Sequence, residues 1–240
     1  MNYIICSHKI SCEIEKNLVN LGVTPVKIRG FENFGETHPL NYHPDMFCFN
    51  LEKNKWIFYE EIYKKNKKIT DKLNLDIIMA ENPVSCEYPH DIGLNAAMFG
   101  DNLICNIERT NEKILDYAKQ TKKNIIGVKQ GYAKCSVCIV DESSIITSDE
   151  SVYKKASQNN INVLLIQKGH INLDGYDCGF IGGCSGLINK NKLAFTGNIK
   201  LHPDYENIKS FCGGRGVEAV SLSKEKLYDY GSIFKQIINL

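Results

Sequence analysis

The chain has 240 residues, of which 43% are hydrophobic and 24% charged, and its formal net charge is +1. These values are typical of a globular protein with a substantial core, and they give no global field that would attract nucleic acid or an acidic membrane. No apolar run approaches the length of a membrane span, and the first residues resemble a strand rather than a signal peptide. We therefore expect a cytoplasmic protein without nucleic-acid or membrane partners, whose ten cysteines are free thiols.

Five similar blocks follow one another along the chain, and each is predicted to form a strand, a helix and a second strand. Short runs rich in Ile, Val and Leu, bounded by Asn, Gly or Asp, are typical of buried strands. In chain order, the three elements are predicted at 3–6, 13–21 and 24–28; 56–59, 60–73 and 76–79; 102–105, 111–121 and 124–128; 144–147, 151–159 and 162–166; and 192–195, 203–212 and 218–222. Ser148, Asp149 and Ser151 offer N-caps to the fourth helix, and Gly213 with Gly214 is expected to end the fifth.

A tyrosine heads a fourth segment in each block, and we interpret this segment as another strand. The five tyrosines are Tyr42, Tyr88, Tyr132, Tyr176 and Tyr228, and they are separated by 46, 44, 44 and 52 residues. A near-constant period is the signature of a repeat architecture. Since one unit cannot bury both its sheet and its helix alone, we predict a single domain over 1–240, with strand-helix-strand-strand repeats at about 1–50, 51–99, 100–142, 143–190 and 191–240.

The tyrosine-headed segments also carry chemistry-bearing side chains. The stretch 131–139 reads as a short buried strand that presents Cys135, and the first segment offers His43 and Asp45. Side chains alternate along a strand, so the first and third positions after each tyrosine are expected to share one face. That face would also carry three further aspartates, Asp91, Asp177 and Asp229.

Five such repeats, with polar groups converging on a central axis, resemble the pentein fold, the five-bladed α/β propeller of guanidino-group-modifying enzymes. His43-Pro-Asp45 is similar to the His-x-Asp segment of arginine deiminases, and the stretch around Cys135 is similar to the segment of their nucleophile. The cysteine's repeat follows the histidine's by two repeats, as in that family, although the chain starts at a different repeat. The resemblance implies a bacterial branch of the superfamily with a shifted repeat order, in which Asp177 and Asp229 stand where the family has further acidic residues.

The resemblance assigns a role to each of these groups. Cys135 would attack the central carbon of a guanidino or amidino compound through a covalent thiouronium-type intermediate, and His43 would protonate the departing amine. Asp45, with Asp91, Asp177 or Asp229, would bind the planar cation by charge-assisted hydrogen bonds. Water would then complete a hydrolysis, or an acceptor amine an amidino transfer. We expect no cofactor and no metal.

Plainer interpretations remain open for each residue. A buried Cys135 is ordinarily an inert small hydrophobe, and His43-Pro-Asp45 could be only a turn. Asp177 and Asp229 could be turn residues, and Asp91 could cap a loop. The five tyrosines are expected to pack rather than to react, and the glycine-rich stretch 179–186 is explained by close backbone packing near the axis.

Three other functions compete with the hydrolase. One is a non-catalytic pentein that binds a ligand or macromolecular partner, one is a sensor that has kept the pocket without turnover, and one is a zinc or redox protein that uses Cys135-x-x-Cys138. The sequence identifies neither the substrate nor the oligomeric state. The stretch 29–40, with its glycines and proline, is a candidate for a lid over His43.

Overall fold

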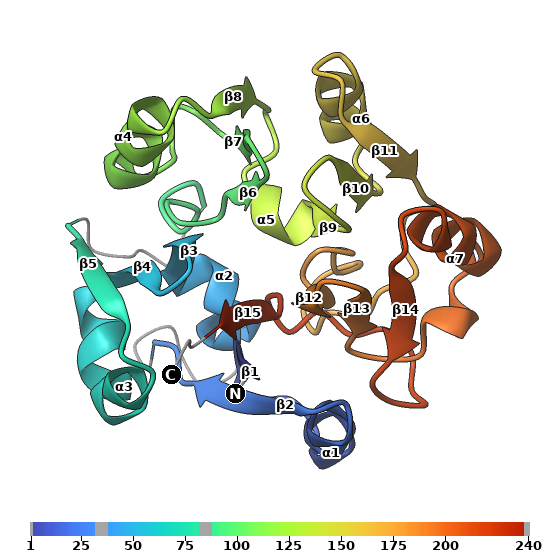
Figure 1. Cartoon of the computed structure of the whole chain (residues 1–240), viewed down its shortest axis with the longest axis horizontal. Helices are drawn as coiled ribbons and strands as arrows, with labels where there is room; N and C mark the ends of the chain where they lie inside the picture. The colour runs from blue at the N-terminus through green and yellow to red at the C-terminus, as the bar shows by residue number, and fades with distance from the viewer. Residues whose placement is uncertain (1, 32–37, 82–87, 238–240) are drawn as a thin grey trace.

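Five separate three-stranded sheets stand around a common centre, with one helix at the outer edge of each (Figure 1). The structure, a computed structural model, describes residues 2–31, 38–81 and 88–237. Every sheet contains one antiparallel and one parallel strand pair, and the outer helix connects the two parallel strands. This arrangement confirms the predicted five-bladed α/β propeller.

The elements of the five sheets repeat in the same order. They are β15 (Phe234–Ile237), β1 (Asn2–Ser7), α1 (Cys12–Asn20) and β2 (Val23–Ile28); β3 (Cys48–Glu52), β4 (Lys55–Tyr59), α3 (Glu60–Lys72) and β5 (Asp76–Ala80); β6 (Ala97–Phe99), β7 (Asn102–Cys105), α4 (Glu112–Gln120) and β8 (Asn124–Gly127); β9 (Cys138–Ile139), β10 (Ser144–Thr147), α6 (Glu150–Ser157) and β11 (Asn162–Leu165); and β12 (Ser185–Asn189), β13 (Lys192–Phe195), α7 (Tyr205–Gly213) and β14 (Glu218–Ser221). The short helices η1 (Pro39–Tyr42), α2 (Pro44–Phe47) and α5 (Ala133–Ser136) lie between the blades, and η2 (Ile199–Leu201) lies within the last blade, between β13 and α7.

All five predicted strand-helix-strand blocks are present, and local signals set their ends. The Asp149 carboxylate accepts the backbone N–H groups of Ser151 and Val152, so α6 begins where a free backbone donor finds a side-chain acceptor. Helix α7 ends at its C-cap, Gly214, as predicted. The middle strand of each blade is buried, as in β10, where all four residues are buried, because a helix covers one face and a neighbouring blade the other.

The predicted strands headed by tyrosine are wrong in position. His43 is the N-cap of α2, and Tyr132 is the N-cap of α5, so Asp45 and Cys135 lie in single helical turns. The inner strands β3 and β9 begin only after these turns. Pro44 explains the first turn, because it has no N–H and its fixed φ suits the first position of a helix.

The blades also combine parts of two predicted repeats. The last strand of one repeat pairs antiparallel with the first strand of the next, as β3 pairs with β4. At the end of the chain, β15 pairs with β1, from Asn2 opposite Ile237 to Ile5 opposite Phe234. The first blade is therefore completed by the last strand, and this pairing joins the two ends of the chain into a ring (Figure 1).

The innermost strands position the site. Strands β3, β6, β9, β12 and β15, which we call the axial strands, face the centre of the ring (Figure 1). A turn or a short helix precedes each of them, and these five connections are the segments that can meet near the axis. Of the predicted lid, residues 32–37 lie outside the described residues. No helix in the described part of the chain has both the length and the apolar character needed to cross a membrane.

Candidate active site

Three of the predicted residues meet near the axis. The thiol of Cys135 lies 3.1 Å from Asp45 Oδ2, and one polar atom each of His43, Asp45 and Cys135 lies within 4.8 Å of the other two. All three side chains are at least 98% buried. The structure thus brings together the residues that strand alternation selected, although helical turns rather than strands place them there.

Asn95, which the sequence analysis missed, holds the turn that carries the thiol. Its Oδ1 accepts the backbone N–H groups of Lys134 and Cys135 at 2.7 and 3.3 Å, and its Nδ2 lies 3.2 Å from Cys135 Sγ. The same Nδ2 donates to the backbone oxygen of Asp45 at 3.2 Å. The one available signal was a polar residue in the apolar run Leu94-Asn-Ala-Ala-Met, immediately before an axial strand.

A chain of polar groups leads from the thiol to a buried ammonium. Asp45 Oδ2 lies 2.6 Å from Ser232 Oγ, and Lys134 Nζ donates to the same hydroxyl at 3.0 Å. Both Ser232 and Lys134 are buried, and neither was singled out from the sequence. This chain fixes one carboxylate oxygen of Asp45, whereas Asp45 Oδ1 is buried without a hydrogen-bond partner.

Asp229 faces His43 from the segment that leads into the last axial strand. Its Oδ1 lies 3.7 Å from His43 Nδ1, and the backbone N–H groups of Gly231 and Phe180 hold the two carboxylate oxygens at 3.0 and 2.9 Å. A Cβ at Gly183 would overlap this carboxylate, which confirms that close packing near the axis explains the glycine-rich stretch. Both ring nitrogens of His43 are buried without a hydrogen-bond partner, so the imidazole is available to a bound molecule.

Burial controls the protonation of these four groups. It raises the pKa of the Cys135 thiol well above its usual value, an effect that the carboxylates of Asp45 and Asp229 increase. It lowers the pKa of His43 to about 4, and it raises the pKa of Asp45 and brings that of Asp229 to about 6. Near neutral pH the site therefore combines a protonated thiol with a neutral imidazole, and a cation beside the two carboxyl groups would favour their ionised form.

The remaining two predicted aspartates lie elsewhere. Asp91 is buried and accepts the Tyr132 hydroxyl at 2.8 Å, so it supports the residue that starts α5. Asp177 is exposed, and no hydrogen bond or ion pair of the described residues joins it to the cluster. The structure therefore brings Asp229 into contact with His43 but does not bring Asp177 there.

The repeated tyrosines gather around the cluster with Phe180, and we call this set the aromatic collar. It consists of Tyr42, Tyr88, Tyr132, Tyr176, Phe180 and Tyr228. The ring of Tyr42 lies 5.4 Å from that of His43, and its hydroxyl is 3.3 Å from the Tyr228 hydroxyl. Tyr88 and Tyr176 are 57% and 46% exposed, so the collar extends from the buried groups to solvent.

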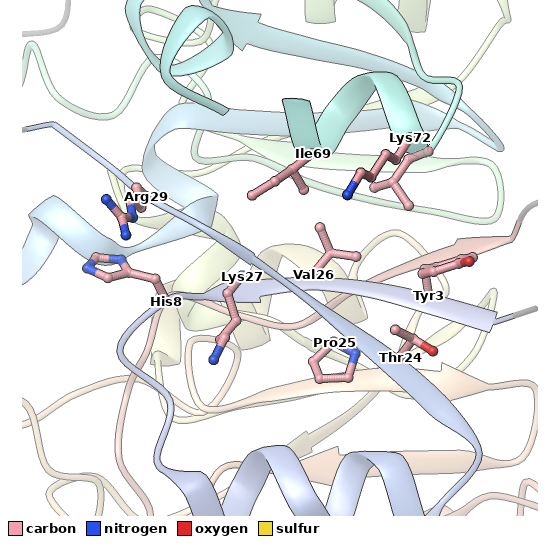
Figure 2. A pocket seen from close by; sticks show the side chains of 10 residues that line it. Tyr3, His8, Thr24, Pro25, Val26, Lys27, Arg29, Ile69 and Lys72 are labelled. Atoms are coloured by element: carbon pink, nitrogen blue, oxygen red, sulfur yellow. The ribbon is translucent and has the colours of Figure 1, made fainter. Parts of the chain in front are cut away.

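A peripheral groove of about 600 Å³ lies away from this cluster, between β2 and α3. Figure 2 shows its lining residues, among them His8, Lys27 and Arg29. Lys27 is paired with Glu15 at 2.7 Å. None of the four buried groups lines the groove, so we do not assign it to the candidate active site.

The same cluster is the group of described residues that could hold a metal ion. His43, Asp45 and Cys135 offer a nitrogen, an oxygen and a sulfur, a donor set that suits zinc. Cys138 is not part of it, and no disulfide joins the cysteines that the structure describes. We expected no metal, and the residues alone leave that expectation untested.

The sequence matches the model of a family of unknown function, DUF6873, over residues 5–234. The chain belongs to this family. No curated protein matches it.

Solved structures show which fold this member of the family shares. The chain is similar to SxtG, an amidinotransferase from Microseira wollei in the saxitoxin biosynthetic pathway, with a TM-score of 0.57, 12% identity, and coverage of 92% of this chain and 88% of that one. It is similar to the agmatine deiminase of C. jejuni (TM-score 0.54, 12% identity, 100% and 93% coverage). It is also similar to the inosamine-phosphate amidinotransferase StrB1 of Streptomyces griseus (TM-score 0.54, 10% identity, 94% and 80% coverage). The chain thus has the pentein fold of guanidino-modifying enzymes.

Proposed function

We propose that this protein is a cysteine-dependent enzyme that acts on a small guanidino or amidino compound. The observation that carries the proposal is the convergence of Cys135, His43, Asp45 and Asp229 in one buried cluster. A nucleophile, a proton carrier and two carboxylates for a planar cation are the groups that this chemistry requires. The fold shared with two amidinotransferases and a deiminase supports it.

The first step converts the bound guanidinium into a thioether of the enzyme. The free Oδ1 of Asp45 binds N–H groups of the substrate, and the positive charge favours ionisation of the Cys135 thiol. The sulfur forms a bond to the central carbon, and His43 carries the thiol proton to the departing nitrogen. Ammonia or an amine leaves, and the thiouronium that remains on Cys135 keeps the positive charge.

The second step releases the product. His43 takes a proton from water, whose oxygen bonds to the thiouronium carbon, and the carbon–sulfur bond breaks to return the thiol and a ureido product. The proton that is left over ionises the released ammonia or amine. If an amine takes the place of water, the same two steps transfer an amidino group.

The surroundings of the site narrow the substrate. Free arginine would need a cation for its carboxylate, and no hydrogen bond or ion pair among the described residues joins any of the three arginines to the aromatic collar. Arg215 contacts Ser144 and lies 3.8 Å from Asp141, Arg29 lines the peripheral groove, and Arg109 is exposed. We propose a guanidine without a carboxylate at its far end.

The remaining parts of the proposal follow from the same site. A free thiol nucleophile requires a reducing compartment, so we propose a cytoplasmic location. We also propose one domain over residues 1–240, whose ring starts at a shifted blade. His43 and Cys135 then keep the spacing of two repeats that the resemblance to arginine deiminases implies.

The test is release of ammonia or amine from a panel of guanidino and amidino compounds. Wild type is compared with Cys135→Ala and with Cys138→Ala, which removes a neighbouring buried thiol outside the cluster. We expect turnover in wild type and Cys138→Ala and none in Cys135→Ala. If no compound reacts and Cys135 also resists alkylation in their presence, the protein is a binding pentein; equal loss in both variants would indicate a redox pair.

A further inference from the structure

A second cavity, of about 910 Å³, lies along the axial strands beyond the candidate active site. We call it the axial cavity. The active-site groups precede the axial strands, whereas the lining of this cavity follows the strands to their far ends. It is formed by Phe49, Asn50, Lys53, Ala96, Met98, Phe99, Gly100, Lys134, Ile139–Ser143, Ser185, Gly186, Leu187, Asn189, Lys190 and Ile233–Lys235.

The wall of the axial cavity is largely apolar. Phe49, Met98, Phe99, Leu187 and Phe234 line it from four of the five axial strands. A concave site with apolar walls and a few charged groups is the usual form of a small-molecule site. The charged groups then decide which molecule it accepts.

Lys134 supplies a buried cation to this cavity. Only 7% of the surface of this residue is exposed. Its one hydrogen-bond acceptor among the described residues is the neutral Ser232 hydroxyl at 3.0 Å. The ammonium also lies 5.5 Å from the centre of the Phe234 ring, and no described carboxylate lies within 4.0 Å of it. An ammonium has three N–H donors, so this one can still bind an anion.

Three further lysines, Lys53, Lys190 and Lys235, line the axial cavity without a carboxylate partner in the described residues. Burial lowers the pKa of Lys235, and repulsion by Lys190 lowers it further. Two acidic residues also line the mouth: Asp141, which lies 3.8 Å from Arg215, and Glu142. Four lysines without a paired carboxylate in the described residues, against two acidic residues, favour an anionic ligand over a cationic one.

We propose that the axial cavity binds a small organic anion, with a carboxylate that pairs with Lys134 and an apolar body that packs against Phe49, Met98 and Phe234. Lys190 and Lys235 attract the anion to the mouth. This site takes a ligand of opposite charge from the guanidinium of the active site, and Lys134 separates the two. The proposal does not depend on turnover by Cys135.

The test uses 8-anilinonaphthalene-1-sulfonate as a fluorescent probe and octanoate and octanamide as competitors. We expect saturable binding of one probe molecule and displacement by octanoate at about tenfold lower concentration than by octanamide, because only the carboxylate pairs with an ammonium. Lys134→Met should weaken octanoate about tenfold and leave octanamide unchanged. The matched control is Lys64→Met, which removes an exposed lysine of α3 outside the cavity.

A second variant keeps the test decisive if Lys134→Met does not fold. Leu187→Trp fills the axial cavity and leaves Lys134 in place, so it should abolish probe binding while the circular dichroism spectrum stays unchanged. The double variant Lys190→Gln/Lys235→Gln should reduce octanoate affinity and its salt dependence. Absence of saturable binding, equal displacement by octanoate and octanamide, or unchanged probe binding in Leu187→Trp would each overturn the proposal.

Discussion

The tripeptide His-Pro-Asp occurs twice in this chain, at residues 43–45 and 202–204, and the two copies differ in every contact that matters for chemistry. The first copy starts α2 beside the axis, where both nitrogens of His43 and one oxygen of Asp45 have no hydrogen-bond partner. The second lies between η2 and α7, at the outer edge of the blade that β12, β13 and β14 form (Figure 1). Its histidine is equally buried, at 3% exposure against 1%.

In the second copy, side-chain atoms of His202 and Asp204 accept hydrogen bonds from backbone N–H groups. His202 Nδ1 accepts the backbone N–H of Asp204 at 3.1 Å, and Asp204 Oδ2 accepts that of Gln167 at 2.8 Å. These bonds lower the pKa of Asp204, whereas burial raises that of Asp45. The same three residues thus form a hydrogen-bonded turn at the outer edge of one blade and, at the axis, a turn whose polar atoms are partly unpaired. Their place in the fold rather than the motif makes the difference.

The largest expected effect comes from removing each histidine. His43→Ala should lower the turnover of a substrate found in the panel by about 10²–10⁴-fold, the usual contribution of general acid–base catalysis. His202→Ala should leave turnover within about threefold and lower the free energy of unfolding by about 1–2 kcal/mol, since it removes a buried hydrogen bond. Steady-state kinetics measures the turnover of each variant, and denaturant unfolding measures its stability. Equal losses of turnover in the two variants would show that the two copies do not differ in function.

The two aspartates give the next effect. Asp45→Asn should raise KM for a guanidinium about 10–100-fold, because charge-assisted hydrogen bonds contribute about 1.5–3 kcal/mol. Asp204→Asn keeps an oxygen for the Gln167 N–H, so KM should not change. A guanidinium that binds Asp45→Asn as tightly as wild type, in a calorimetric titration, would remove Asp45 from the binding site.

The pH dependence of stability should separate the buried carboxylates from the perimeter one. Asp229 has a pKa of about 6 in the folded protein against 3.8 as its reference value, so the folded state binds the extra proton and stability from this group falls as pH rises from about 4 to 6. The free energy of unfolding lost in this way is roughly 3 kcal/mol, because the folded and reference pKa values differ by about two units. His43 acts in the opposite direction over a similar range, so the readout is the difference between wild type and Asp229→Asn at each pH.

Asp204 should behave in the reverse sense. Its folded pKa is lowered, so its contribution is present above pH 4 and is lost only as pH falls below the reference value. The difference between wild type and Asp204→Asn should therefore stay constant from pH 5 to 7. If the difference in unfolding free energy between wild type and Asp229→Asn did not change from pH 4 to 6, the pKa of Asp229 would not be raised in the folded protein.

The smallest effect is expected from the two prolines. Pro44→Ala and Pro203→Ala should each lower the free energy of unfolding by about 0.5–1 kcal/mol, because the loss of a fixed φ makes the unfolded chain more flexible. Only Pro44→Ala should also reduce kcat, by about threefold to tenfold, since α2 orients His43 and Asp45. Identical kcat values in the two variants would show that the proline at 44 does not set the geometry of the site.

Periodicity in the sequence predicted the blades well. Apolar runs such as those of β4 and β10 are buried on both faces, and this burial is a local requirement that a local pattern records. The predicted strand at Cys135 was wrong because Asn95, 40 residues earlier, satisfies the backbone of a helical turn there. A pattern within one segment cannot reveal such a partner.

The complete candidate site was beyond the sequence for the same reason. Asp45 meets Cys135 across 90 residues and Ser232 across 187, and both contacts exist only because the blades form a ring. Lys134 and Ser232 carry no motif, and an ammonium that reaches Asp45 through the Ser232 hydroxyl is recognisable only in three dimensions. Asp177 shared the repeat position of Asp229 but not its surroundings, since the loop around it is exposed.

The pairing of β15 with β1 has a consequence for the order in which the protein is made. Asp229, Gly231 and Ser232 belong to the segment that leads into β15, so the groups that face His43 and bind Asp45 arrive with the strand that completes the first blade. During translation, Cys135 leaves the ribosome long before that segment is synthesised. A nascent or stalled chain therefore carries Cys135, His43 and Asp45 without Asp229 and Ser232, and the candidate site is complete only when the fold is complete.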